Sequence, residues 1–156
     1  MMKSILFVCL GNICRSPLAQ GVTQNYINKN NLDILVNSCG TSSYHIGEPP
    51  CENSIKVAKL HNIDISNYKA SQLTKDDLKN FDIVIALDES NYEDILSLGC
   101  NEQKLFKLGY FGYENADIPD PYFFNGFDGF EKVFEMVESC VLDIFEKNKK
   151  IKHFYP

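Results

Sequence analysis

The stretch Cys9-Leu10-Gly11-Asn12-Ile13-Cys14-Arg15-Ser16-Pro17 is the feature around which the chain is organised. The apolar run before it, Ile5-Leu6-Phe7-Val8, indicates a short buried strand. Ser16 followed by Pro17 predicts a helix start, with serine at the N-cap and proline at the first helical position. A strand therefore ends at a cysteine, a tight loop follows, and an arginine closes that loop at a helix N-terminus.

A loop of this kind is suited to holding an anion. Free backbone N–H groups at a helix N-terminus attract negative charge, and Gly11 and Asn12 tolerate the positive φ that a ring of inward-facing amides needs. The same potential stabilises a Cys9 thiolate, and the planar fork of Arg15 matches two phosphate oxygens. The alternative is an unreactive buried cysteine with an arginine nearby by chance. The strand before the loop and the helix after it favour a cysteine nucleophile in an oxyanion cradle.

Composition indicates a globular protein. With 156 residues, of which 44% are hydrophobic, we expect a single domain over residues 1–156. A net charge of −6 argues against a nucleic-acid partner, which would need clustered lysine and arginine. We interpret the one basic run, from Lys147 to Lys152, as favourable charge at the C-terminus of the last helix.

The sequence also predicts a compartment and excludes several kinds of site. No stretch has the apolar length that spans a bilayer, and the N-terminus has no signal-peptide pattern, so we expect a cytoplasmic protein with no membrane partner. Six cysteines are too sparse for a disulfide scaffold in a chain of this size, and neither a CxxC pair nor a Cys/His cluster indicates zinc. We therefore expect reduced thiols, no metal and no cofactor.

Strands and helices alternate along the chain. We predict strands at 4–8, 34–36, 82–87 and 104–108, helices at 16–29, 51–61, 89–98 and 129–147, a further helix start at 74, and loops at 37–50 and 109–128. This order predicts an α/β fold with a four-stranded parallel sheet flanked by helices on both faces and a phosphate-binding loop after strand one. In such sheets ligands bind beyond the carboxyl ends of the strands, where the strand order reverses.

The run from Val8 to Pro17 is similar to the signature of the low-molecular-weight protein tyrosine phosphatases, and Asp120-Pro121-Tyr122 extends the resemblance. Segments 41–47 and 87–91 also fall where similar segments fall in that family. The resemblance spans nearly the whole chain. It implies a metal-independent phosphatase that acts on tyrosine-phosphorylated proteins or small aryl phosphates, releases inorganic phosphate and works as a monomer.

The resemblance also implies roles for individual residues. Cys9 attacks phosphorus to form a cysteinyl phosphate, Arg15 and backbone N–H groups hold the equatorial oxygens, and Asp120 protonates the leaving phenolate and later accepts a proton from water. Spacing alone does not separate Asp120 from Asp117 or Asp128, although the proline that follows restricts Asp120 to an extended backbone. The predicted phosphate- and substrate-binding residues are Leu10, Gly11, Asn12, Ile13, Cys14, Ser16, Tyr44 and Tyr122.

Some of these residues keep two interpretations. Ser16 can cap the helix or, as the family implies, hydrogen-bond the sulfur of Cys9. Asn12 can brace the loop or only tolerate its backbone angle. In the family a cysteine in the place of Cys14 can form a reversible disulfide with the nucleophile under peroxide, which protects it from further oxidation. The alternative for Cys14 is a buried thiol that packs under the loop, and the sequence leaves this open.

Aromatic side chains on the loops suit a phenyl phosphate. Tyr44 and Tyr122 are the expected walls of the pocket, Phe123 stands where many family members have a second tyrosine, and His45 is a candidate for tuning peptide selectivity. An arsenate reductase of the same fold is an alternative, but it needs two further cysteines near the end of the third strand, and 82–91 contains none. A cysteine-linked phosphocarrier and a silent phosphotyrosine-binding module are disfavoured because Cys9, Arg15 and Asp120 are all present.

Overall fold

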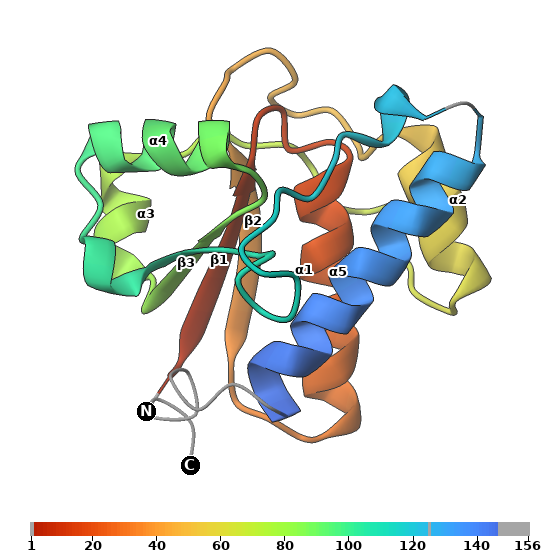
Figure 1. The fold of residues 1–156 in the computed structure, drawn as a ribbon, viewed down its shortest axis with the longest axis horizontal. Coiled ribbons are helices and arrows are strands. Elements are labelled where there is room, and N and C mark those ends of the chain that lie inside the picture. Colours follow the sequence, from red (N-terminus) through yellow and green to blue (C-terminus); the bar gives the residue numbers. More distant parts are fainter. Residues whose placement is uncertain (1, 125, 147–156) are drawn as a thin grey trace.

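The structure, a computed structural model, describes residues 2–124 and 126–146. Its strands form one parallel sheet in the order β2-β1-β3-β4, with helices on both faces (Figure 1). The strands are β1 (Ser4–Cys9), β2 (Leu35–Gly40), β3 (Ile83–Ala86) and β4 (Leu105–Lys107). The helices are α1 (Arg15–Lys29), α2 (Glu52–Leu60), α3 (Lys75–Asn80), α4 (Glu89–Leu98) and α5 (Asp128–Glu146). The α/β class and the parallel four-stranded sheet agree with the sequence prediction.

The sheet separates two hydrophobic cores, because successive side chains of a strand point to opposite faces. Ile5 and Phe7 of β1 pack in the larger core, with residues of α1, α2 and α5. Leu6 and Val8 pack in the smaller core, with residues of α3 and α4. Every residue of β1 is buried, as expected for a parallel strand covered on both faces. Figure 1 shows the two layers of helices on either side of the sheet.

Helix ends follow local signals in the sequence. Thr74 caps α3 with a reciprocal capping box to Asp77. Asp88 caps α4, and that helix ends at Gly99, whose φ of 108° is left-handed. The buried face of α5 carries the apolar stripe that the sequence predicts to be core. The predicted basic charge at the end of this last helix, residues 147–152, lies outside the described residues.

Two local predictions are wrong. The second strand runs from Leu35 to Gly40, because β2 pairs with β1 along its whole length, and this pairing overrides the polar character that predicted a loop from residue 37. Helix α1 begins at Arg15, so Cys14 takes the N-cap position and Ser16 does not cap the helix. Pro17 stays in the first turn, where backbone N–H groups have no partner within the helix.

The topology places one crevice at the carboxyl edge of the sheet. The chain leaves β1 for β2 on one side, and β3 pairs with β1 on the other. The order therefore reverses between β1 and β3, where open α/β sheets bind ligands. Cys9 ends β1 and Asp88 follows β3 by two residues. Within the described residues, no helix combines the length and the apolar character needed to cross a membrane.

Candidate active site

The loop that joins β1 to α1 is held from outside through its carbonyl oxygens. The donor–acceptor pairs are Thr41 N–H to Cys9 O (2.9 Å), Ser42 N–H to Leu10 O (2.9 Å), Cys51 N–H to Ile13 O (2.7 Å) and the Ser54 hydroxyl to Cys14 O (3.1 Å). In a trans peptide the C=O group and the following N–H group point in opposite directions. Carbonyls bound from outside therefore direct the following N–H groups into the loop, which makes the loop an anion cradle.

Asn12 both adopts the special backbone angle and braces the loop. Its φ is 57°, and its backbone N–H donates to the sulfur of Cys9 at 3.2 Å. Its side-chain amide donates to the hydroxyl oxygens of Ser16 (2.8 Å) and Ser38 (2.9 Å), and its carbonyl oxygen accepts from the Ser71 backbone N–H at 3.0 Å. Both interpretations of Asn12 therefore hold at once, since one buried side chain ties the loop to two distant segments.

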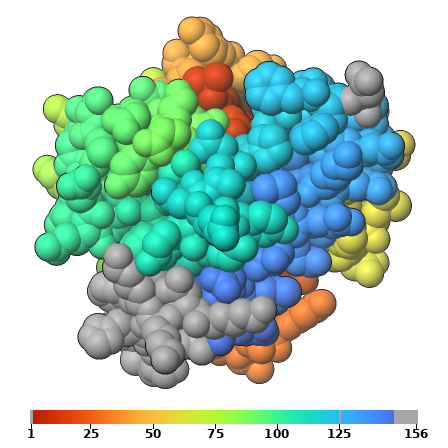
Figure 2. Space-filling model, viewed as in Figure 1, coloured from red at the N-terminus to blue at the C-terminus, as the bar shows by residue number. Residues whose placement is uncertain are grey.

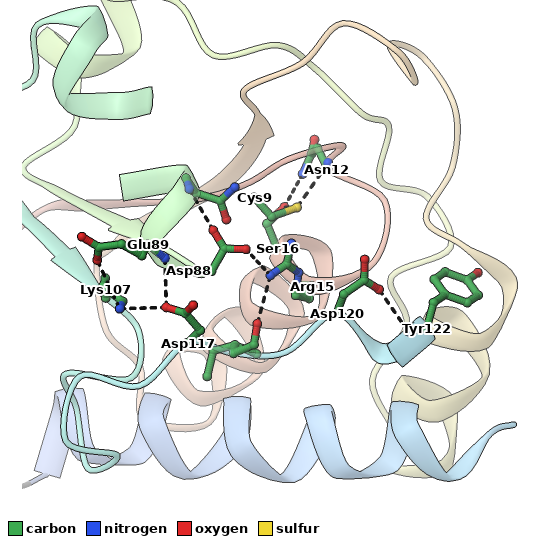
Figure 3. Close-up of polar contacts among 12 residues, drawn as sticks. Cys9, Asn12, Arg15, Ser16, Asp88, Glu89, Lys107, Asp117, Asp120 and Tyr122 are labelled. Atoms are coloured by element: carbon green, nitrogen blue, oxygen red, sulfur yellow. Dashed lines mark hydrogen bonds and ion pairs between the residues drawn. The ribbon is translucent and has the colours of Figure 1, made fainter. Parts of the chain in front are cut away.

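Cys9 lies at the floor of the cradle, with 3% of the residue exposed. Its sulfur is 3.0 Å from the Ser16 hydroxyl oxygen, and Figure 3 shows this serine directly beside the thiol. Because the Ser16 oxygen already accepts a hydrogen bond from Asn12, its own proton is free to donate to the sulfur of Cys9. Of the two interpretations of Ser16, the fully buried hydroxyl therefore hydrogen-bonds the sulfur of Cys9 and does not cap the helix.

Arg15 is anchored on one side and faces the cavity on the other. One terminal nitrogen, Nη1, donates to Asp88 Oδ2 at 2.7 Å and to the carbonyl of Ile118 at 2.9 Å (Figure 3). The arginine side chain is 9% exposed and that of Asp88 is 19% exposed, so the ion pair is largely shielded from water. The other oxygen of Asp88 accepts from the Asn91 backbone N–H at 2.8 Å, which fixes the carboxylate at the N-terminus of α4.

A second ionic cluster lies behind this pair. The buried Lys107 contacts Asp117 at 2.7 Å and Glu89 at 3.3 Å, and Asp117 also accepts from the Glu89 backbone N–H at 2.9 Å. Partial burial works to raise the pKa of Asp117, but the hydrogen bond and charge of Lys107 outweigh it and lower that pKa. The cluster ties the end of β4 to the segment that leads into Asp120 (Figure 3).

The structure distinguishes the three aspartates that spacing left equivalent. Asp117 is bound to Lys107, and Asp128 is the first residue of α5. Asp120 lines the same cavity as Cys9. Its Oδ1 accepts from the backbone N–H of Tyr122 at 3.0 Å and caps a short 3₁₀ helix, Pro121–Phe123. The turn after Asp120 thereby orients its carboxyl group.

The catalytic candidates share one small cavity of about 160 Å³. Its lining residues are Cys9, Leu10, Gly11, Ile13, Cys14, Arg15, His45, Asp120 and Tyr122. An apolar protein cavity of about 150 Å³ holds a benzene ring, so the space is of the size of one phenyl group. Figure 2 shows the loop, in red, recessed between surface segments from the 40s and the 120s of the sequence. Larger cavities of about 470 Å³ lie elsewhere and are lined by none of these residues.

Not every predicted wall residue reaches the cavity. Asn12 and Ser16 lie behind its wall, where they hold Cys9. Tyr44 is 80% exposed and does not line the cavity. The neighbouring His45 does, because its Nδ1 is 2.7 Å from Glu48 Oε2 and its ring packs close to Gly11.

Several residues that sequence reasoning missed position this site. Asp88 and Lys107 fix the arginine side of the cavity, and the only local signal for Asp88 is an aspartate between a strand and a helix. Gly40 lets β2 approach the loop, since a Cβ there would lie 2.7 Å from the Leu10 carbonyl oxygen. Cys51, whose sulfur lies beside Cys14, carried no signal at all. Among residues 2–124 and 126–146, no group of three or more His, Cys, Asp or Glu side chains is arranged to hold a metal ion.

Known proteins share this sequence and this fold. A family model for low molecular weight phosphotyrosine protein phosphatase matches residues 4–153. PtpA of Staphylococcus aureus, a low molecular weight protein-tyrosine-phosphatase, is 40% identical over 97% of this chain and 99% of its own. A protein tyrosine phosphatase from Entamoeba histolytica, solved with Hepes in the active site, has a TM-score of 0.85 and 35% identity, covering 93% of this chain and 96% of its own.

A further solved relative carries a phosphonate ligand. Wzb of Vibrio vulnificus, in complex with benzylphosphonate, has a TM-score of 0.81 and 27% identity, covering 90% of this chain and 95% of its own. The family match extends over almost the whole chain, including the cysteine loop and the Asp120 turn. The chain therefore belongs to the low molecular weight phosphotyrosine protein phosphatase family and is a protein-tyrosine-phosphatase, a phosphoric monoester hydrolase.

Proposed function

We propose that Cys9, Arg15 and Asp120 carry out the hydrolysis through a cysteinyl-phosphate intermediate, without a metal ion. The observation that supports this most directly is that a thiol, a guanidinium and a carboxyl group line one cavity of about 160 Å³. Phosphoryl transfer needs a nucleophile, neutralisation of the charge on the equatorial oxygens and a proton for the leaving group. Each of the three residues supplies one of these.

In the first step the Cys9 thiolate attacks phosphorus from the floor of the cradle. The hydroxyl of Ser16 and the backbone N–H of Asn12, at 3.0 and 3.2 Å, stabilise the sulfur anion before attack. Arg15 and the inward-facing N–H groups bind the three equatorial oxygens, whose charge is spread in the transition state. Asp120 donates its proton to the leaving phenolate oxygen as the bond from that oxygen to phosphorus breaks.

In the second step water attacks the phosphorus of the cysteinyl phosphate. The carboxylate of Asp120 takes a proton from this water, the bond from sulfur to phosphorus breaks, and Cys9 returns to the thiolate. Ser16 again stabilises the sulfur as it leaves. Inorganic phosphate is the second product, and Asp120 is protonated again for the next cycle.

The cavity favours aryl over alkyl phosphates. A phenyl ring fills a space of this size, and Tyr122 and Ile13 supply apolar wall. The phosphonate bound by the Vibrio relative is benzylphosphonate, which, like an aryl phosphate, carries a phenyl ring. We therefore propose phosphotyrosine in proteins and small aryl phosphates as substrates of a monomeric, cytoplasmic enzyme that binds neither membranes nor nucleic acid. Tyr44 stands too far out to contact the phenyl ring, so its proposed contribution is to the peptide around the phosphotyrosine.

The experiment compares two substrates across three variants. With p-nitrophenyl phosphate and a phosphotyrosine peptide, we expect Cys9→Ser to abolish turnover of both. Asp120→Ala is expected to lower kcat on the peptide by about 10²–10⁴-fold, the range of general acid catalysis. Its effect on p-nitrophenyl phosphate should be much smaller, because nitrophenolate leaves without a proton. Asp128→Ala, at the start of α5, is the matched control and should change neither rate.

Two outcomes would overturn the proposal. If Asp120→Ala and Asp128→Ala had equal effects, the general acid would lie elsewhere. If EDTA abolished hydrolysis and an added divalent cation restored it, the mechanism would depend on a metal. A phosphotyrosine-binding module would bind the peptide without releasing phosphate, so release of phosphate by the wild type excludes that alternative.

A further inference from the structure

Two thiols lie together at the mouth of the cradle, outside the proposed mechanism. Cys14, which precedes α1, donates from its Sγ to the Sγ of Cys51 at 2.6 Å, although the two residues are 37 positions apart. Both are free thiols. Cys14 lines the cavity and is buried, and Cys51, behind it, is half-buried. A disulfide has a sulfur–sulfur distance of about 2.05 Å, so bond formation requires only a small movement of the two side chains.

The backbones on both sides of the pair are already tied together. The Cys51 N–H donates to the carbonyl of Ile13 at 2.7 Å, and the Ser54 hydroxyl donates to the carbonyl of Cys14 at 3.1 Å. Cys51 is also the N-cap residue of α2. These contacts hold the two thiols in register independently of the contact between their sulfur atoms. The pair is therefore a built feature of the loop and not two side chains that meet by chance.

The two thiols differ in acidity, because the hydrogen bond between them has opposite effects on their pKa values. The hydrogen bond from Cys14 lowers the pKa of Cys51 to about 6 against the opposing effect of burial, and contacts with Ser54 and the Tyr122 hydroxyl add to the lowering. The same hydrogen bond, together with burial, raises the pKa of Cys14. Cys51 is therefore the more acidic of the two thiols, and Cys14 is the one that keeps its proton more tightly. This is the arrangement of an attacking and a resolving cysteine.

We propose that Cys14 and Cys51 form a redox-active dithiol that hydrogen peroxide converts into an intramolecular disulfide. The Cys51 thiolate attacks one peroxide oxygen, the O–O bond breaks, hydroxide leaves and a sulfenic acid forms on Cys51. The Cys14 sulfur then attacks the Cys51 sulfur, the S–O bond breaks, and the leaving hydroxide combines with the thiol proton to give water. The two thiols lose two electrons and the peroxide gains them.

This pairing gives Cys14 a partner other than Cys9. The resemblance to the phosphatase family implied a Cys9–Cys14 disulfide, but the sulfur that Cys14 contacts is that of Cys51. The disulfide joins the phosphate loop to α2, and it does so without consuming the nucleophile. Oxidation of Cys14 and Cys51 therefore leaves the Cys9 sulfur unmodified, whereas oxidation of Cys9 itself would remove the nucleophile.

A tryptic map under non-reducing conditions separates the two pairings. Cys9 and Cys14 lie in one tryptic peptide, residues 4–15, whereas Cys51 lies in residues 30–56 together with Cys39. After peroxide treatment we expect residues 4–15 to be cross-linked to residues 30–56 in most of the protein, and the cross-link to disappear with dithiothreitol. A closed loop within 4–15, which is the Cys9–Cys14 disulfide, would overturn the proposal.

Three variants make the assignment specific. Cys51→Ser should lose the cross-link, and Cys39→Ala, the matched control within the same peptide, should keep it. The Cys9→Ser variant should also form it, because the step needs no part of the phosphatase reaction. A cross-link that survives in Cys51→Ser, or that is absent in Cys9→Ser, would show that the pair is not the autonomous dithiol proposed. Near-ultraviolet circular dichroism of each variant checks that it is folded.

The pH dependence of oxidation gives an independent measurement. Titratable groups that face the pair are Cys9 and Asp120 beside Cys14, and Tyr122 beside both thiols. Partial burial and the neighbouring thiols raise the pKa of Tyr122 to about 12, so its hydroxyl remains protonated throughout. In the Cys9→Ser background, cross-linking by peroxide at about pH 5 should be about tenfold slower than at its plateau above about pH 7, because only the thiolate reacts. A rate that does not change over this range would contradict the assignment of Cys51 as the attacking thiol.

Discussion

The two sides of the cavity are built in opposite ways. What we call the charged wall is Arg15, which lines the cavity, with the ion-paired residues behind it, Asp88, Glu89, Lys107 and Asp117. What we call the open rim is His45 and Tyr122, which line the cavity, with the neighbouring residues Cys51 and Phe123. The charged wall joins the ends of β3 and β4 to the loop through ion pairs, and its arginine side chain is 9% exposed. On the open rim, Tyr122 is 63% and Phe123 83% exposed.

From this difference we propose different tasks for the two sides. A phosphate group is the same in every substrate, so the residues that bind it can be fixed by long-range contacts within the sheet layer. The peptide around a phosphotyrosine varies, and so does the oxidant concentration to which a thiol responds. Substitutions of exposed aromatic residues usually change the free energy of unfolding little, so residues on the open rim can differ between relatives without loss of stability. The predictions below test whether the charged wall carries catalysis and the open rim carries selectivity.

Among substitutions on the two sides of the cavity, the largest effect is expected for Arg15→Lys on the charged wall. Lysine keeps the positive charge but lacks the planar fork that can bind Asp88 on one side and two phosphate oxygens on the other. Loss of one such transition-state contact lowers kcat by about 10²–10³-fold. Steady-state kinetics with p-nitrophenyl phosphate measure this loss. A loss of less than tenfold would mean that the charge alone is sufficient and that the fork geometry is not used.

Asp88→Asn should have the next largest effect. Asparagine still caps α4 through its side-chain oxygen, so the substitution removes the charge that holds Arg15 and leaves the helix N-terminus intact. We expect kcat to fall by about ten- to a hundredfold, less than for loss of the arginine fork itself. KM should change little, since Asp88 holds Arg15 and does not line the cavity.

Asp94→Asn is the control for this variant. It makes the same change of charge on an exposed position of the same helix and should leave kcat unchanged. Equal losses in the two variants would show that the effect is one of net charge on α4. In that case the ion pair between Asp88 and Arg15 would not be the positioning contact.

The sequence was sufficient for the parts of the site that local signals encode. The strand, the loop and the following helix lie within one continuous stretch, so Cys9 and Arg15 could be placed together from their order alone. Asp120 needed the family resemblance, because three aspartates flank the same loop. The structure supplies the physical distinction, since Asp117 is already paired with Lys107.

The rest could not be predicted because it depends on contacts between distant segments. Asp88 reaches Arg15 only because β3 pairs beside β1, and Cys51 reaches Cys14 only because the start of α2 docks on the loop. The four polar or small residues that end β2 had no strand pattern of their own, and pairing with β1 decides their conformation. Of the two interpretations of Ser16, the helix cap is wrong and the hydrogen bond to Cys9 is confirmed, because the buried thiol lies within reach of its hydroxyl and the helix begins one residue earlier.

On the open rim, Tyr122→Ala and Tyr44→Ala should separate the ring that contacts the substrate from one that does not. Tyr122 lines the cavity and Tyr44 does not. We expect Tyr122→Ala to raise KM for p-nitrophenyl phosphate about five- to tenfold, equivalent to roughly 1 kcal/mol of lost ring contact. Tyr44→Ala should change KM for p-nitrophenyl phosphate by less than about twofold. If Tyr44→Ala had the larger effect on KM for p-nitrophenyl phosphate, Tyr44 and not Tyr122 would contact the phenyl ring.

The smallest effect concerns stability and returns to the charged wall. Asp117→Asn keeps an oxygen that can accept from the Glu89 N–H but loses the ion pair with Lys107. The Asp117 side chain is 53% exposed, so its ion pair contributes at most about 1 kcal/mol. Its folded-state pKa is lowered, with Lys107 outweighing burial. The contribution is therefore complete above the unfolded pKa of about 3.9 and is lost as the pH falls through the lower folded value.

Urea unfolding of wild type and Asp117→Asn at two pH values tests this sign. The variant should be less stable at about pH 7, and the difference should be smaller at about pH 3, because protonation of the wild-type carboxylate removes the ion pair as the pH falls towards its lowered pKa. A difference of the same size at both pH values would mean that the substitution acts through packing or hydrogen bonding. The contrast between the two sides of the cavity would then rest on the pair of Arg15 and Asp88 alone, because the cluster behind it would add no charge-dependent stability.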